Sequence, residues 1–174
     1  MHAIIPSEIM RTFPANNIAV LRLNFRGVGN SQGSFEDGVG EVLDALAGIK
    51  TMHDILEGIP LILVGSSFGA DTAFSTVDER VDAWCGCAPG LRDEKIPRFQ
   101  SVADDPRPKL LVLAERDEIR AAQDALDITN NWNNTTTVVL KGATHFLVGR
   151  VEDAISAIQN FVVDTANSKT GHGQ

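Results

Sequence analysis

A serine between two glycines is the residue of this chain best placed to do covalent chemistry. The apolar stretch Leu61–Val64 ends in Gly65-Ser66-Ser67-Phe68-Gly69, and small residues then begin a predicted helix. A nucleophile at a sharp strand-to-helix turn needs glycines on both sides, because the backbone is strained and neighbouring chain approaches closely. The pattern therefore predicts Ser67 as a nucleophile, and the helix N-terminus behind it offers partial positive charge to a developing oxyanion.

A serine hydroxyl is a poor nucleophile unless a base takes its proton, and histidine is the usual base. The chain has four histidines. His2 and His172 lie close to the termini, and His53 ends a predicted helix, away from any predicted strand end. His145 follows the last predicted strand, so it is expected at the same sheet edge as Ser67. It is the candidate base, with a surface-loop histidine as the alternative.

The base needs an acid that holds its ring and stabilises its charged form. The charged run Glu115-Arg116-Asp117-Glu118 follows the predicted strand 109–114, so it also lies at a carboxyl end. A solvated charged loop is the alternative for this run. The order along the chain is therefore serine, acid, histidine.

The elements that must position these residues alternate between strands and helices. Continuous apolar strands are predicted at 18–25, 61–66, 81–88, 109–114 and 135–140. Helices are predicted near 5–13, 39–52, 68–77, 119–130 and from 151 onward, with a polar loop at 89–108. This alternation predicts a parallel sheet covered on both faces, with its chemistry at the carboxyl ends of the strands. We expect one domain over 1–164 and a disordered tail over 165–174.

Composition excludes several classes of function. With 174 residues, 43% of them hydrophobic, the chain is long enough for one globular core. The net charge of -8 disfavours nucleic acid as a partner. No apolar run approaches the ~20 residues that span a bilayer, and the start lacks a signal peptide, so we expect a cytoplasmic protein without membrane partners.

The same composition gives no support for a metal or an organic cofactor. Cys85 and Cys87 lack a second ligand pair for zinc, so they are predicted to be buried, reduced thiols. Gly27, Gly29 and Gly33 follow a predicted strand, but their spacing does not match a dinucleotide-binding turn.

The motifs together resemble small, lidless bacterial α/β-hydrolases of the dienelactone-hydrolase-like kind. The turn Asn24–Gly38 matches that family. The turn Gly65–Gly69 around the nucleophile also matches, with serine where true dienelactone hydrolases carry cysteine. The run at 115–118 resembles the acid loop, and 142–146 resembles the histidine loop, in the family's order. The resemblance implies a three-layer α/β-hydrolase-type parallel sheet and a triad of Ser67, Asp117 and His145, with Glu118 as second choice for the acid.

One part of the family pattern is missing. Its members carry a strand between those that correspond to 18–25 and 61–66, ending in a turn that donates one oxyanion N–H, and no counterpart is found here. The resemblance therefore implies an N-terminally shortened sheet of about five strands, with the Phe68 N–H as the one oxyanion donor that the motifs supply. Three alternatives stay open: the two strands pair directly, a partner chain fills the gap (as in a homodimer through this edge), or the sequence begins inside a longer gene.

These observations predict a serine carboxylesterase that acts on small soluble esters through an acyl-enzyme, with no cofactor. The region 89–108, where relatives insert a lid, is short, so the site should be open and shallow. Leu91, Ile96 and Phe99 are candidates for one of its walls. The alternative is a non-enzymatic or weakly active binding protein with an incomplete oxyanion hole.

Overall fold

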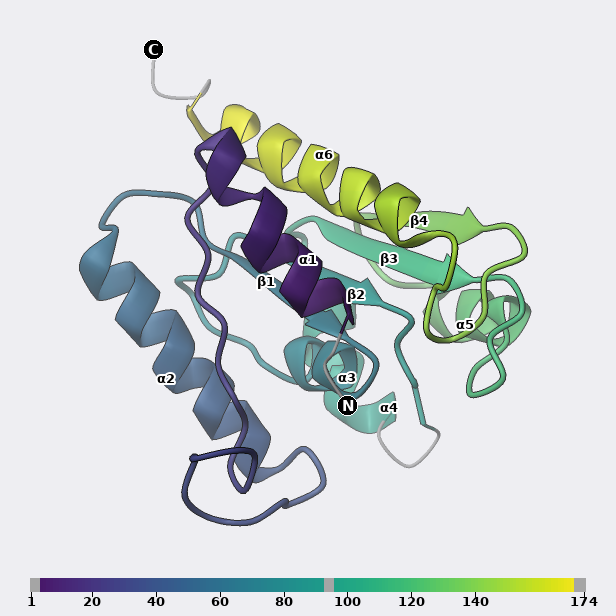
Figure 1. Cartoon of the computed structure of the whole chain (residues 1–174), viewed down its shortest axis with the longest axis horizontal. Coiled ribbons are helices and arrows are strands. Elements are labelled where there is room, and N and C mark those ends of the chain that lie inside the picture. Colours follow the sequence, from purple (N-terminus) through teal and green to yellow (C-terminus); the bar gives the residue numbers. More distant parts are fainter. Residues whose placement is uncertain (1–3, 93–95, 171–174) are drawn as a thin grey trace.

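The computed structural model describes residues 4–92 and 96–170 and contains a four-stranded parallel sheet in the order β1-β2-β3-β4 (Figure 1). The strands are β1 Ile62–Ser66, β2 Ala83–Cys87, β3 Lys109–Ala114 and β4 Thr135–Leu140. The helices are α1 Ile4–Thr12, α2 Gly40–Ile55, α3 Phe68–Phe74, α4 Ile96–Ala103, α5 Ala122–Thr129 and α6 Val151–Thr170, and Pro14–Asn16 forms a 3₁₀ turn. The predicted parallel sheet with helices on both faces is confirmed.

The central strands send alternate side chains into two separate cores, as expected for a sheet buried on both faces. Cys85, Cys87 and Val112 pack with α1 and α6 on one face. Trp84 and Leu111 pack with α2, α3, α4 and α5 on the other. Figure 1 shows α1 and α6 lying together over one side of the sheet. Because all four strands are parallel, their carboxyl ends lie at one edge of the sheet.

The prediction of a strand at 18–25 is wrong. These residues are extended, but they join no strand ladder, so the sheet has four strands rather than about five. An apolar strand forms only where a neighbour offers backbone groups to bond, and here a groove separates residues 18–25 from β1. The alternative in which the first two predicted strands pair directly is therefore also wrong.

The loop predicted at 89–108 contains the helix α4. Phe99 and Val102, three residues apart, are 1% and 0% exposed and pack into the core beneath α2 and α3. Leu91 is also fully buried. Leu91 and Phe99 are therefore core residues, and the prediction that they line an open wall is wrong, because their burial leaves them no surface to offer a ligand.

Helix α6 is longer than predicted. It continues through Thr170, because Val162 and Thr165 still bury their side chains against neighbouring elements. The predicted disordered tail is therefore helical over 165–170, and the rest of that prediction lies outside the described residues. None of the helices over the described ranges is long and apolar enough to cross a bilayer, and the predicted cytoplasmic location stays a prediction.

The first turn of α3 rests directly on β1 at Gly65. A Cβ at Gly65 would lie 2.0 Å from the carbonyl oxygen of Gly69 and 2.5 Å from the backbone nitrogen of Ala70. A Cβ at Gly69 would meet no atom within 4 Å. Of the two glycines that the sequence pattern requires, only Gly65 is therefore required by a steric contact in the described structure.

This difference can be tested by the matched substitutions Gly65→Ala and Gly69→Ala. Because backbone atoms cannot move aside, Gly65→Ala should destabilise the fold by at least about 2 kcal/mol, as overpacking does. That corresponds to a fall in Tm of roughly 4–8 °C for a chain of this size. Gly69→Ala should leave Tm unchanged or raise it slightly, since alanine favours a helix. Thermal unfolding followed by circular dichroism measures both, and equal losses would contradict the close contact at Gly65.

Candidate active site

Ser67 lies at the sharp turn between β1 and α3. Its φ of 52° and ψ of -121° place a non-glycine residue in a conformation that costs about 1–3 kcal/mol. The turn is held by the Ser67 N–H, which donates to the carbonyl oxygen of Cys87 at 2.9 Å, and by the contact of α3 with Gly65. The strained turn therefore fixes the Ser67 side chain at the carboxyl edge of the sheet.

The three predicted site residues are brought into one hydrogen-bonded line. Ser67 Oγ lies 2.8 Å from His145 Nε2. On the other side of the ring, His145 Nδ1 lies 3.0 and 2.9 Å from the two carboxylate oxygens of Asp117. Because a carboxylate only accepts, this pattern assigns the ring proton to Nδ1 and leaves Nε2 to accept the serine proton. His145 and Asp117 are 6% and 8% exposed, so water competes little for these contacts.

Two loops at neighbouring strand ends are tied together and so position the histidine. We call residues 115–118 the acid loop and residues 141–146 the histidine loop. Glu115 accepts the Gly142 N–H at 2.7 Å, and the Arg116 N–H donates to the Ala143 carbonyl at 2.8 Å. These bonds continue the pairing of β3 with β4 beyond the strand ends. The ring of His145 is therefore placed by the sheet rather than by a free loop.

The two candidate acids have different roles. Asp117 contacts the ring, and its Oδ1 also accepts the N–H groups of Ile119 at 2.8 Å and Arg120 at 3.2 Å. Glu118 instead accepts the backbone N–H of His145 at 3.2 Å, and this bond holds the pKa of the Glu118 carboxyl below its ordinary value. The geometry thus pairs the imidazole with Asp117 and gives Glu118 a contact with the backbone only.

Aromatic side chains surround the serine and the histidine. Phe68, the residue after the serine, lies between Phe25 and Phe35, with ring centroids 5.7 and 5.3 Å away. Phe146 meets the His145 ring edge-on at 5.5 Å. The glycine-rich turn (residues 26–34) therefore packs beside the turn at Ser67, and the half-exposed Phe146 and the more exposed Phe35 give the site an apolar rim.

The glycine-rich turn is held by buried and half-buried charges. Arg26 pairs with Asp44 at 3.0 Å and with Glu36 at 2.9 Å, and its guanidinium lowers the pKa of the Asp44 carboxyl. Glu41, fully buried, accepts the N–H groups of Glu36 at 2.9 Å and Gly38 at 2.8 Å. Glu36 and Glu41 therefore have structural roles, and these contacts hold Phe35 beside Phe68.

Asp71, in the first turn of α3, is a buried residue that supports the site. It is 4% exposed, and its Oδ1 accepts the Leu91 N–H at 3.0 Å. Arg120, from the segment after the acid loop, donates to the carbonyl oxygens of Gly90 and Leu91 at 3.1 and 2.9 Å. Asp71 and Arg120, both distant in the sequence, thus hold residues 90–91 in place. No local pattern in the sequence predicts these contacts.

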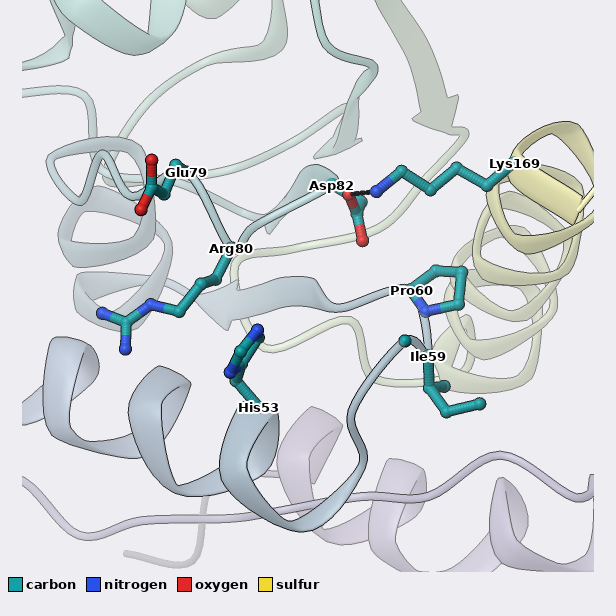
Figure 2. Close-up of a pocket in the computed structure, with 8 residues that line it drawn as sticks. His53, Ile59, Pro60, Glu79, Arg80, Asp82 and Lys169 are labelled. Carbon is teal, nitrogen blue, oxygen red and sulfur yellow. Dashed lines mark ion pairs between the residues drawn. The ribbon is translucent and has the colours of Figure 1, made fainter. Parts of the chain in front are cut away.

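A cavity of about 360 Å³ lies at the end of the sheet where the strands begin (Figure 2). Its lining residues are His53, Gly58, Ile59, Pro60, Glu79, Arg80, Asp82 and Lys169. Asp82 pairs with Lys169 and accepts the Leu61 N–H at 2.8 Å, while Arg80 pairs with Asp78. Because the strands begin here, this cavity is remote from Ser67, and His53 has no contact with the predicted site.

The two cysteines are buried in β2, as predicted. Both are free, and burial raises the pKa of the Cys87 thiol to about 12 and that of Cys85 as well, so both stay protonated at neutral pH. Over the described ranges, no three His, Cys, Asp or Glu side chains gather as a metal-binding group. His2 and His172 lie outside the described residues.

The chain is similar to an uncharacterised protein and to solved structures of serine hydrolases. It is 30% identical over 166 residues to Uncharacterized protein RP471 of Rickettsia prowazekii, covering 90% of this chain and 70% of that protein. An α/β serine hydrolase homologue from Coxiella burnetii is 29% identical with a TM-score of 0.79, covering 90% of this chain and 75% of that one. XC6422 of Xanthomonas campestris, a serine hydrolase without a lid, is 27% identical with a TM-score of 0.82, over 94% and 74%.

No protein-family model matches the chain. The two solved structures nevertheless match 90% and 94% of it at TM-scores of 0.79 and 0.82, so the predicted α/β-hydrolase-type fold is confirmed, with a shorter sheet. The similarity to RP471 extends over most of both proteins. The chain therefore belongs to the family of RP471 and has the α/β-hydrolase fold.

Proposed function

We propose that this protein is a serine hydrolase of the dienelactone-hydrolase-like kind that cleaves small soluble carboxylic esters. The observation that carries the proposal is the unbroken hydrogen-bond line from Ser67 Oγ through His145 to Asp117. The strained backbone at Ser67 adds support, because strain is retained where it presents a reactive group. The similarity to serine hydrolases from Coxiella and Xanthomonas points the same way.

In the proposed reaction, Ser67 Oγ attacks the ester carbonyl carbon while His145 Nε2 takes the hydroxyl proton. The carbonyl oxygen becomes an oxyanion beside the Phe68 N–H at the start of α3. The bond to the alcohol oxygen then breaks, and His145 returns its proton to the leaving alcohol. Water, deprotonated by His145, attacks the acyl-serine, releases the acid and restores Ser67. Asp117 keeps the imidazole oriented and stabilises its charged form.

The surroundings of the site favour small esters. After β2, Leu91 and Phe99 turn into the core, and Ser67 stays partly exposed among the described residues. The apolar rim of Phe35 and Phe146 can contact an acyl or alcohol group from the side, and both rings stay open to solvent. A short ester therefore gains some apolar contact without the enclosure that a long acyl chain needs.

The first test is covalent labelling of Ser67. The purified protein should react with a fluorophosphonate probe and hydrolyse p-nitrophenyl acetate. Ser67→Ala should abolish labelling and lower hydrolysis by about 10³-fold or more, because the nucleophile is lost. Ser66→Ala is the matched control, one residue away, and should keep labelling. Ester hydrolysis that persists in Ser67→Ala would show that this serine is not the nucleophile.

The second test separates the two candidate acids. Asp117→Asn should lower kcat by about 10²–10⁴-fold, because an amide can present its NH₂ group to the ring and reverse the tautomer of His145. Glu118→Gln should change kcat less than about threefold, since an amide oxygen still accepts the His145 N–H. Initial rates with p-nitrophenyl acetate measure both, and thermal unfolding checks that each variant is folded. A larger loss in Glu118→Gln than in Asp117→Asn would reverse the assignment.

The competing function is a binding protein that keeps the fold without efficient catalysis. The motifs supply one oxyanion donor, the Phe68 N–H, and losing a donor typically costs ~10²–10³ in kcat. Probe labelling of Ser67 no faster than that of free N-acetylserine amide would favour this function. Labelling much faster than that standard would favour the hydrolase even where turnover of p-nitrophenyl acetate is slow.

A further inference from the structure

Two aromatic side chains at the rim of the site stay out of the core. Phe35 is 63% exposed and Phe146 is 49% exposed. Single exposed apolar side chains are common on protein surfaces, so exposure alone indicates no function. These two rings, however, lie beside the reacting residues. Phe146 meets the ring of His145 at 5.5 Å, and Phe35 meets Phe68, the residue after Ser67, at 5.3 Å.

Phe146 is presented to solvent by a turn that is fixed on both sides of it. Its neighbours His145 and Leu147 are 6% and 1% exposed, and the Leu147 N–H donates to the carbonyl of Thr144 at 2.8 Å. Leu147 has a φ of 55°, a conformation that few non-glycine residues adopt. The ring of Phe146 is therefore kept beside the imidazole instead of turning into the core.

Phe35 directly follows the glycine-rich turn and is fixed by the backbone of the next residue. The buried Glu41 accepts the N–H of Glu36 at 2.9 Å. The ring of Phe35 lies against Phe68 at an interplanar angle of 52°, and Phe68 also meets Phe25 at 5.7 Å. The contact with Phe68 covers part of the Phe35 ring, and the remainder is open to solvent.

The two rings approach Ser67 from opposite sides. His145 and Phe146 come from the loop after β4, which is separated from β1 by β2 and β3 in the sheet. Phe35 comes from the segment after residues 18–25, which lie beyond the other edge of β1. In Figure 1 the dark turn before α2 and the loop between β4 and α6 lie on either side of α3.

The chemistry of the proposed hydrolase gives these two sides different parts of the ester. His145 must return its proton to the leaving alcohol oxygen, so this oxygen has to come within about 3 Å of Nε2. The alcohol group therefore lies on the side of His145 and Phe146. The oxyanion points to the Phe68 N–H. The acyl group is the remaining substituent of the carbonyl carbon, and it extends away from His145, towards Phe35.

We propose, building on the proposed function, that Phe146 sets the specificity for the alcohol group of the ester and that Phe35 sets the specificity for its acyl group. Because an aromatic ring packs well against another ring, each position favours an aromatic over an aliphatic group. The preferred substrates are small arylalkyl esters. Each ring contacts its group from one side only, so each preference amounts to about three- to tenfold in kcat/KM.

Two series of esters test this division. The alcohol changes from propyl acetate to benzyl acetate in the first series. The acyl group changes from p-nitrophenyl acetate to p-nitrophenyl phenylacetate in the second. Phe146→Ala should lower the preference for benzyl over propyl acetate by about three- to tenfold in kcat/KM and leave the acyl preference unchanged. Phe35→Ala should do the reverse. Each preference is a ratio compared between variants, so the intrinsic reactivity of the esters cancels.

Val148→Ala and Ile55→Ala are the control variants. Both side chains are more exposed than the two rings, at 73% and 69%. Val148 lies two residues after Phe146, and Ile55 is the last residue of α2. Neither control should change either preference by more than about twofold. Phe146→Leu and Phe35→Leu keep an apolar side chain without the ring, and each should lose its aromatic preference. Thermal unfolding checks that every variant is folded.

Pre-steady-state kinetics separate a contact with the alcohol from an effect on the histidine. The alcohol has departed before water attacks the acyl-serine. Phe146→Ala should therefore slow acylation by p-nitrophenyl acetate and leave deacylation unchanged. Phe35→Ala should slow both steps with the phenylacetyl ester, since the acyl group is present in both. If Phe146→Ala slowed acylation and deacylation equally, the ring would act by positioning His145, and the assignment to the alcohol would be wrong.

The outcomes separate this assignment from the proposed function. If the wild-type protein hydrolyses these esters through Ser67, and the alanine variants shift both preferences equally or shift neither, the division between Phe146 and Phe35 is overturned. If the wild-type protein is not labelled at Ser67 and hydrolyses none of the esters, the proposed function fails, and the assignment fails with it.

Discussion

The contact between the first turn of α3 and Gly65 is the constraint on which the site depends. With no side chain at Gly65, the backbone of Gly69 and Ala70 comes close enough to β1 that the chain must reverse within a single residue. That residue is Ser67, and its positive φ is the result. Burial of Phe74 and Ala70 against Trp84 and the β2 backbone holds α3 in this place. The strain at the nucleophile is therefore balanced by packing that lies below it.

The second requirement is a histidine that reaches the serine from a different strand. The register of β3 with β4 brings Ala114 beside Leu140, so the acid loop and the histidine loop start at the same level. Their backbone bonds then continue the ladder, and Asp117 and His145 meet where solvent is largely excluded. A charge-assisted contact in such a place is stronger than one in water. The geometry of the hydrogen bonds that join Ser67, His145 and Asp117 thus follows from strand register rather than from loop conformation.

Much of this could be predicted from the sequence where a local pattern determines the structure. The strands 109–114 and 135–140 were predicted with the bounds that the structure has, because each is a continuous run of apolar or β-branched residues between polar breaks. Ser67, Asp117 and His145 were found because each follows a strand. The choice of Asp117 over Glu118 depended on the family resemblance, and the structure gives its physical reason in their different partners.

The failures share a different cause. Residues 18–25 have the pattern of a strand, but pairing depends on a neighbour that the pattern cannot show. Helix α4 was missed because prolines and charges dominate residues 89–108, and the burial of Phe99 and Val102 comes from Phe74 and Trp132 elsewhere in the chain. The contact of Asp71 with Leu91 was missed for the same reason, since the two residues lie 20 positions apart. In each case a distant contact, not the local sequence, decides the outcome.

The triad depends on only one of the two lateral edges of β1. The edge towards β2 carries the bonds that fix Ser67, through Cys87, and α3 presses on the face of the strand at Gly65. The edge towards residues 18–25 contributes nothing to these contacts. The positions of Ser67, His145 and Asp117 therefore do not depend on that side of β1. The groove between β1 and residues 18–25 reaches the site only at its end, where Phe25 and Phe68 meet beside the serine.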